Sequence, residues 1–396
     1  MSERILRVGV AGLGRGFTLM LPTLTADPRV ALVAAADPRP EAREQFARDF
    51  GASVYGTVAE LCADPTVEVV YVSTPHHLHA GHVAAAAAAG KHVLVEKPMA
   101  VTLDECRSMI AAAQQAGVHL VVGHSHSFDR PVARAREIIA SGEVGAVRMI
   151  TALNFTDFLY RPRRPEELAT DQGGGVIFSQ GAHQIDIVRL LGGGRVRSLR
   201  AMTGAWDRSR PTEGAYAALL TFENGVFASA TYSGYGHFDS DEFTGWIDEL
   251  GGPKDRSRYG AGRRSLLTVP QGEAEAALKN ARTYGGASYR SSPSPGEARL
   301  HQHFGLIVAS CERADLRPVP DGVMVYGDFE EKLDPLPAPA IPRAEVIDEL
   351  YDAVVLGRPP LHSGAWALAT LEVCLAILTS ARDGREIALA HQVAVP

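Results

Sequence analysis

Lys97 is the residue whose type and surroundings point most directly to chemistry. It lies between Glu96 and Pro98, at the end of an apolar run (92–96) with the composition of a strand. Ligand crevices of α/β proteins form at the carboxyl ends of strands, and a partly desolvated ammonium there can hold a reacting oxygen and relay its proton. Lysine is rare in this chain, which favours this role over an ordinary surface lysine. A cis bond between Lys97 and Pro98 would fix the direction of the side chain.

A second candidate for proton transfer is His183, on a predicted helix (179–191) that follows the glycine run 173–175. Imidazole titrates near neutral pH and suits acid–base work, although a single helical histidine is more often structural. Ser179 stands four residues earlier, and a hydroxyl cannot act as a carboxylate base at neutral pH. We expect Asp186, one helical turn after the histidine, to be structural or to orient a neighbour.

Three arginines, Arg161, Arg163 and Arg164, follow a predicted strand (147–155) in a segment stiffened by prolines. A guanidinium binds a carboxylate through two parallel hydrogen bonds, so the cluster predicts recognition of an anionic substrate. The alternative is a solvated loop, because arginine is abundant throughout the chain.

A compact polar group follows later in the chain, made of His237, Asp239, Asp241 and Glu242. These residues could line a pocket, with His237 reaching the substrate, or hold a divalent ion together with His301 and His303. The His-x-His pair shares one face only if it lies on a strand, so solvent-facing loop residues are the favoured interpretation. We expect no metal.

The elements that would position these groups begin with a glycine-rich turn between a strand and a helix. Such a turn lets a pyrophosphate approach the backbone and the helix N-terminus. The usual third glycine would fall at Phe17, so the motif is weak by itself. The next strand ends at Asp37, whose carboxylate would accept hydrogen bonds from the adenosine ribose and favour NAD, whereas Arg39 could hold a 2′-phosphate. The expected cofactor contacts here are Gly12, Gly14, Arg15, Gly16, Asp37 and Arg39.

Strand-like and helical stretches alternate through the first 125 residues, which predicts βαβ units and a parallel sheet. After residue 129 the strands alternate in polarity and carry aromatic residues, which predicts an antiparallel meander interrupted by one helix. We therefore expect an α/β chain with a dinucleotide-binding domain at 1–128 and an α+β domain at 129–396. A variable segment, 236–300, reads as a long loop or lid.

Several motifs together resemble the glucose–fructose oxidoreductase / inositol dehydrogenase / MocA (Gfo/Idh/MocA) family. They are Ser73–His79, Glu96-Lys97-Pro98, and Gly181-x-His183-x-x-Asp186. The resemblance implies a Rossmann domain, a second domain with a large open antiparallel sheet, and hydride transfer between a nicotinamide (NAD, with NADP possible) and a carbinol carbon. It implies that Thr74, Pro75 and His79 contact the cofactor, that Glu96 and Lys97 lie at the nicotinamide edge, and that His183 faces the substrate.

The substrate implied by the resemblance is less uniform than the cofactor. The family usually has aspartate where this chain has Ser179, so the substrate is expected to differ from a plain polyol. Three segments, 161–168, 173–193 and 232–243, are similar to the phthalate 4,5-cis-dihydrodiol dehydrogenase-like branch. That branch implies NAD-linked oxidation of a carboxylated cyclic cis-diol to a catechol.

Composition excludes several classes of protein. The net charge of -7 and pI of about 6.1 argue against a nucleic-acid binder. No run of 18 uncharged apolar residues and no leader pattern is visible, so we expect neither a membrane span nor a secreted protein. The four cysteines are scattered, which favours a reducing cytoplasm. An open sheet would leave a broad face to cover, which predicts a homodimer or homotetramer.

Two other functions compete with a simple dehydrogenase. An NAD-retaining glycoside hydrolase or lyase would use transient oxidation and form no net NADH. A non-catalytic cofactor sensor has no need of Lys97, so the intact Glu-Lys-Pro motif argues against it.

Overall fold

The computed structural model describes residues 4–270, 272–290 and 299–396. These residues form two compact units. Unit 1 contains residues 4–124, 276–290 and 340–368, and unit 2 contains 125–270, 272–275, 299–339 and 369–396. The first boundary falls between His124 and Ser125, and the chain later returns twice to unit 1.

Unit 1 is built on a six-stranded sheet in the order β3-β2-β1-β4-β5-β6, with every neighbouring pair parallel. Its central strands β1, β4 and β5 are rich in valine and leucine, and apart from Arg7 and the half-buried His92 their residues are buried, as expected for strands covered on both faces. The strand order reverses between β1 and β4, where α/β sheets form ligand crevices. The strands are β1 (Leu6–Ala11), β2 (Val30–Ala36), β3 (Ser53–Tyr55), β4 (Val69–Val72), β5 (His92–Val95) and β6 (Leu120–Val122).

Local signals fix the ends of the helices in unit 1. Thr57 with Glu60 and Thr102 with Glu105 form capping boxes that start α3 and α5. Gly51 adopts a left-handed conformation where α2 ends. The helices are α1 (Arg15–Ala26), α2 (Pro40–Phe50), α3 (Val58–Ala63), α4 (His79–Ala88), α5 (Leu103–Ala116) and α10 (Ala344–Leu356).

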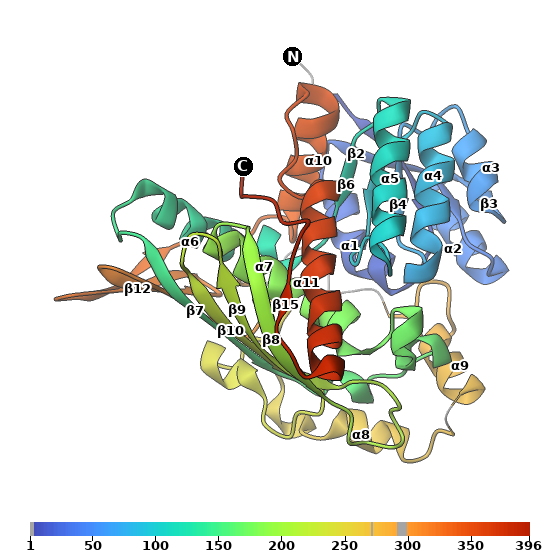
Figure 1. Cartoon of the computed structure of the whole chain (residues 1–396). Helices are drawn as coiled ribbons and strands as arrows, with labels where there is room; N and C mark the ends of the chain where they lie inside the picture. The colour runs from blue at the N-terminus through green and yellow to red at the C-terminus, as the bar shows by residue number, and fades with distance from the viewer. Residues whose placement is uncertain (1–3, 271, 291–298) are drawn as a thin grey trace. The chain divides into compact units, whose positions relative to one another are not determined.

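Unit 2 contains a nine-stranded sheet in the order β14-β13-β12-β11-β7-β10-β9-β8-β15 (Figure 1). The pairs are antiparallel except β7 with β10, which run parallel because a helix and two strands separate them in the chain. The predicted meander is therefore wrong at this pair, while the predicted fold class is confirmed. The strands are β7 (Val147–Phe155), β8 (Val196–Gly204), β9 (Ala215–Phe222), β10 (Phe227–Ser233), β11 (Leu306–Cys311), β12 (Ala314–Val319), β13 (Gly322–Gly327), β14 (Glu331–Pro335) and β15 (Ile387–Ala388).

Helices α6 (Arg130–Ser141) and α7 (Ala182–Gly192) pack on one face of this sheet. The residues of β9 and β10 that face them, such as Leu220 and Ala230, are fully buried. The alternate residues form an open face that exposes large apolar side chains, among them Met149, Met202, Leu219 and Phe227.

The predicted loop at 236–300 contains short helices in its described part. They are the 3₁₀ turns Ser240–Thr244 and Arg256–Arg258 and the helices α8 (Ala261–Leu266) and α9 (Glu273–Ala281). Residues 271 and 291–298 of the predicted loop lie outside the described residues.

Helix α11 (Gly364–Asp383) is long and apolar enough to cross a membrane by length and composition alone. However, 67% of its most apolar stretch is buried inside the protein. Its Glu372 also accepts hydrogen bonds from the backbone of Ala390 and His391. These are the properties of a core helix.

Candidate active site

The glycine turn after β1 has the shape that a dinucleotide needs. Gly12 has a φ of +90°, and a Cβ there would lie 3.0 Å from the Ser73 carbonyl oxygen. A Cβ on Gly14 would meet only that same oxygen, at 3.9 Å, so the space beside this residue is open. Gly14 is also the N-cap of α1 and has no side chain to cap the first N–H groups of the helix. An open cradle at an uncapped helix N-terminus fits a pyrophosphate.

Gly16 performs the packing role of the missing third glycine. A Cβ at this position would lie 3.1 Å from Cγ of Glu96 and 3.2 Å from Cβ of Ser73, so any larger residue would require these side chains to shift slightly. Phe17 instead points into the core and is fully buried. The glycine loop therefore departs from the usual spacing, and Gly16 takes the position at which the helix packs against the β4 and β5 loops.

Asp37 lies at the end of β2 and is almost fully buried. Its Oδ2 accepts a hydrogen bond of 2.8 Å from the Leu13 backbone N–H, which ties the carboxylate to the glycine loop. Arg39 donates to both carboxylate oxygens from Nε and Nη2, at 3.0 and 3.1 Å. Both residues thus lie together at the position where the adenosine ribose of a dinucleotide would bind.

Lys97 follows β5 at the carboxyl end of the sheet, and its bond to Pro98 is cis, as hypothesised. The preceding Glu96 accepts a 2.6 Å hydrogen bond from the Tyr71 hydroxyl. Burial raises the pKa of Glu96, and the hydrogen bond from Tyr71 and the charges of Lys97 and Arg343 only partly offset this effect. The carboxylate therefore sits in an enclosed, positively charged neighbourhood.

His79 has no exposed surface, because it lies beneath the two loops that follow β4 and β5. Its Nδ1 faces the Pro98 carbonyl at 3.0 Å, and its Nε2 faces the Thr74 carbonyl at 2.9 Å. Burial lowers the pKa of His79 to about 4, against the opposing effect of these carbonyl groups. The ring thus braces the Thr74 and Pro98 backbones.

In unit 2, His183 lies in the first turn of α7, directly after a π-helical turn, Ile177–Gly181, that contains Ser179. Single π turns often mark functional sites. Nδ1 of His183 accepts a 3.3 Å hydrogen bond from the His126 backbone N–H. The His183 ring packs against His126 at 4.7 Å and against Phe304 at 5.2 Å. Because Nδ1 accepts the hydrogen bond from the His126 backbone N–H, the proton of the neutral His183 ring sits on Nε2.

His126 is buried between two carboxylates. Its Nδ1 lies 2.6 Å from Asp129, and its Nε2 lies 3.4 Å from Glu249. Burial opposes the charge, but the two carboxylates outweigh it and raise the pKa of His126 to about 9. Glu249 has its pKa lowered by His126, Arg161 and His303, despite burial. We predicted none of His126, Asp129, Glu249 or Phe304 as site residues. His126 and Asp129 lie three residues apart in the chain, but Glu249 and Phe304 join them only in the folded chain.

The three predicted substrate arginines have different surroundings. Arg161 is exposed and reaches Glu249 at 3.7 Å and Asp157 at 3.9 Å, distances too long for hydrogen bonds. Arg163 is buried, stacks 3.7 Å over the Phe158 ring and donates to the Phe158 carbonyl. Burial lowers the pKa of Arg163 to about 10, so it keeps its charge at neutral pH. Arg164 is half-buried at the start of a 3₁₀ turn.

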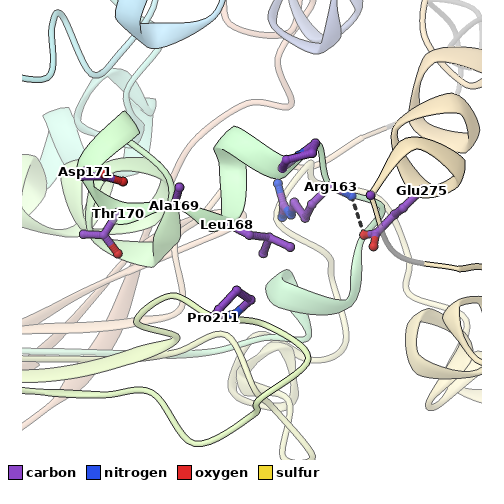
Figure 2. Close-up of a pocket in the computed structure, with 9 residues that line it drawn as sticks. Arg163, Leu168, Ala169, Thr170, Asp171, Pro211 and Glu275 are labelled. Carbon is purple, nitrogen blue, oxygen red and sulfur yellow. Dashed lines mark hydrogen bonds between the residues drawn. The ribbon is translucent and has the colours of Figure 1, made fainter.

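A cavity of about 620 Å³ adjoins Arg163. Figure 2 shows Leu168 and Pro211 on its apolar side and Glu275, on α9, near the backbone of Arg163. Two hydrogen bonds of 2.8 and 2.9 Å from Arg210 neutralise Glu275, whereas Nε of Arg163 has no partner in the described part of the chain. The cavity is lined by Arg163, Pro165, Leu168, Ala169, Thr170, Asp171, Pro211, Gly272 and Glu275.

The remaining predicted residues have clear places in unit 2. Asp186 accepts hydrogen bonds from Ser127 and Thr370 in the core, which is the structural role that we expected. His237 is exposed. His301 and His303 each face a backbone carbonyl, from Pro337 and Ile247, so both rings have a structural partner.

Comparison with known proteins identifies the class. Residues 6–124 match the sequence profile of an oxidoreductase family with an NAD-binding Rossmann fold, and residues 132–244 match the C-terminal domain of the same Gfo/Idh/MocA family. The chain is 52% identical over 374 residues to 1-carboxy-3-chloro-3,4-dihydroxycyclohexa-1,5-diene dehydrogenase of Comamonas testosteroni, covering 94% of each chain. The protein is therefore an oxidoreductase and belongs to the Gfo/Idh/MocA family.

Two further relatives agree with this assignment. A solved structure from Bordetella bronchiseptica RB50, described as a dehydrogenase, is 43% identical with a TM-score of 0.91. It covers 97% of this chain and 100% of its own. Trans-1,2-dihydrobenzene-1,2-diol dehydrogenase of Mus musculus is 32% identical over 58% of this chain and 68% of its own. These relatives lend no support to the hydrolase or lyase alternative.

Proposed function

We propose that this enzyme is an NAD-dependent dehydrogenase that oxidises a carboxylated cyclic cis-dihydrodiol to a catechol. The observation that carries the proposal is the near full-length similarity to the Comamonas testosteroni enzyme, whose name specifies a carboxylated dihydroxycyclohexadiene. The exposed Arg161 and the buried histidine pair of unit 2, His126 and His183, are the groups that we propose bind this substrate and move its protons. Aromatisation of the ring provides the driving force.

Lys97 and His183 share the proton transfers in this proposal. A nicotinamide cofactor, when bound, supplies the hydride acceptor. As the carbinol C–H bond breaks with its electron pair, Lys97 in its neutral amine form takes the proton of the reacting hydroxyl and becomes an ammonium. The resulting hydroxyketone then loses a proton from the ring carbon, and a proton returns to the oxygen to complete the catechol. His183 moves this second proton, because its Nε2 can alternate between donor and acceptor.

Arg161 is the proposed anchor for the substrate carboxylate. Its side chain is 45% exposed, and its two ion-pair partners lie beyond hydrogen-bond distance, so its donors are available. Arg163 is fixed by Phe158 and contributes mainly to the rigidity of the segment. A guanidinium that can form two parallel hydrogen bonds discriminates a carboxylate from a neutral hydroxyl.

NAD is the proposed cofactor, because Asp37 places a carboxylate where a 2′-phosphate would otherwise lie. The cytoplasm is the proposed location, since all four cysteines are free thiols. A second copy of the chain is the proposed partner of the open sheet face, where Phe227 and Met149 lie side by side in register.

The experiment compares reduction of NAD and of NADP with a carboxylated cis-dihydrodiol, the same diol without the carboxylate, and myo-inositol. We expect NADH formation on the carboxylated diol, with a catechol as the product, and loss of this activity in Lys97→Met. Turnover only on myo-inositol would exclude the proposed substrate while leaving the enzyme class intact.

A further inference from the structure

The segment 276–290 belongs to unit 1, although it lies far from the Rossmann strands in the sequence. Tyr284 is 1% exposed, and its ring contacts Phe17 of α1 at 5.1 Å and Phe46 of α2 at 6.5 Å. The Tyr284 hydroxyl donates a 2.6 Å hydrogen bond to Asp49. The segment is thus anchored on the two helices that flank the adenosine side of the glycine loop.

Gly285 shows how closely this segment approaches α2. Its φ is +81°, and a Cβ there would lie 2.4 Å from the Cα of Ala42, which is too short for any side chain. The backbone of the segment therefore rests directly on the backbone of α2. Any larger residue at this position would push the segment off the helix.

The segment also holds Arg39. Nη1 of Arg39 donates to the Thr283 hydroxyl at 3.0 Å and to the Tyr284 carbonyl at 3.1 Å. Nη2 donates to the Leu13 carbonyl at 2.9 Å and to Asp37, and Nε donates to Asp37. Each of the five N–H groups of the guanidinium therefore has an acceptor within unit 1.

We propose that Thr283 and Tyr284 form a hook that sets the cofactor preference, because it keeps the Arg39 guanidinium from binding a 2′-phosphate. The inference rests on the proposed use of NAD. A ribose diol that reaches Asp37 replaces hydrogen bonds from Arg39 with hydrogen bonds of its own. The guanidinium then remains held by Thr283, Tyr284 and Leu13.

A 2′-phosphate meets a different situation at the same position. It brings negative charge next to the Asp37 carboxylate, and it needs a guanidinium or ammonium to compensate for that charge. The Arg39 guanidinium beside Asp37 has all its donors committed to the hook, Leu13 and Asp37. Arg43 also reaches this place, but its Nη1 donates to the backbone carbonyls of Asp37 and Pro38. Releasing the hook frees Nη1 of Arg39, which then becomes a phosphate ligand.

The test measures the dissociation constants of NADH and NADPH by fluorescence titration of the purified enzyme, without turnover. Gly285→Ala displaces the hook and should improve NADPH binding relative to NADH roughly tenfold, the value of one hydrogen bond to a charged group. Thr283→Val removes one acceptor at nearly constant volume and should act in the same direction with a smaller effect. In an Arg39→Ala background, Gly285→Ala should leave the ratio of the NADH and NADPH dissociation constants unchanged.

Gly51→Ala is the matched control, because Gly51 also has a positive φ but a Cβ there would meet nothing. Its ratio of NADH to NADPH dissociation constants should equal that of the wild type. An unchanged ratio in folded Thr283→Val and Gly285→Ala overturns the hook, as does an equal change with and without Arg39. Should Gly285→Ala fail to fold, Thr283→Val decides. Tighter binding of NADPH than NADH by the wild type would instead overturn the proposed use of NAD.

Discussion

Two buried histidines, one in each unit, show how the two halves of the enzyme handle charge. His79 in unit 1 has only backbone carbonyls as partners, and burial lowers its pKa to about 4. His126 in unit 2 is equally buried, but Asp129 and Glu249 overcome the cost of burial and raise its pKa to about 9. Burial alone therefore does not decide the charge of a histidine, because the chemical nature of its partners does.

The difference extends to the surroundings of the two rings. Around His79, the loops after β4 and β5 present only backbone carbonyls to a neutral ring, which donates its single N–H to one of them. Around His126, opposite charges alternate from Asp129 through the imidazolium to Glu249 and Arg161. The surroundings of His79 are therefore uncharged backbone, whereas those of His126 are a chain of alternating charges.

Lys97→Met tests the reactive amine and should have the largest effect. Removing it takes away the group that accepts the hydroxyl proton, so kcat should fall about 10²–10⁴-fold. NADH binding should change little, because the glycine loop remains intact. Steady-state kinetics on the carboxylated diol and NADH titration would show this split. Equal losses in kcat and in NADH affinity would mean that the lysine is structural.

The pH dependence of stability tests the two histidines directly. The His126 pKa is raised on folding, so its stabilisation is complete below about pH 6.5 and is lost as pH rises to about 9. The His79 pKa is lowered on folding, so its contribution is complete above about pH 6.5 and is lost as pH falls to about 4. The free energy of unfolding should therefore fall by about 3 kcal/mol on the alkaline limb of the pH profile, through His126, and by about 3 kcal/mol on its acid limb, through His79.

Chemical denaturation across this pH range would measure both limbs. In Asp129→Asn the alkaline limb should shrink, because the imidazolium loses one of its carboxylates, while the acid limb stays as in the wild type. A variant that changed both limbs equally would contradict the separate assignment of the two histidines.

Arg161→Leu sharpens the comparison on the substrate side. Loss of the guanidinium should raise KM for the carboxylated diol about 10–100-fold, with kcat nearly unchanged, because the interaction is equal in ground and transition states. The diol without the carboxylate should be unaffected. Arg163→Lys serves as the matched variant, since it keeps a charge nearby but loses the stack on Phe158; it should lower stability and leave KM close to that of the wild type.

The open face of unit 2 should give the smallest effect on catalysis. Phe227→Asp places a charge in the exposed apolar face and should convert a dimer to a monomer in light scattering, with little change in activity per chain. Leu267→Asp is the control, because Leu267 is 83% exposed but lies outside the sheet. If light scattering shows the wild-type enzyme to be a monomer, the proposed dimer is excluded.

The sequence predicted unit 1 well because its signals are consecutive. The glycine turn, the acid after β2 and the Glu-Lys-Pro motif each lie within a few residues, and strand order follows from βαβ handedness. The role of Gly16 was not foreseen, since it depends on the distance between α1 and Glu96.

Unit 2 was harder to predict, because its polar centre is assembled from residues far apart in the chain. His183 was recognisable from its spacing, but its partner His126 receives its charge from Asp129, three residues later, and from Glu249, which no local pattern connects to it. The parallel pairing of β7 with β10 likewise depends on a crossover that alternation alone does not reveal. The hook at Thr283 and Tyr284 lies in the segment 236–300, which the sequence predicted as a long loop or lid.

The close contact of Gly16 with Glu96 also has a meaning for the history of this chain. The glycine loop that cradles the cofactor and the loop that carries Lys97 are packed against each other through these two side-chain positions. A side chain at position 16 would require the Glu96 side chain to move by a few tenths of an ångström. We therefore expect positions 16 and 96 to covary among relatives, a pattern that an alignment of the family would test.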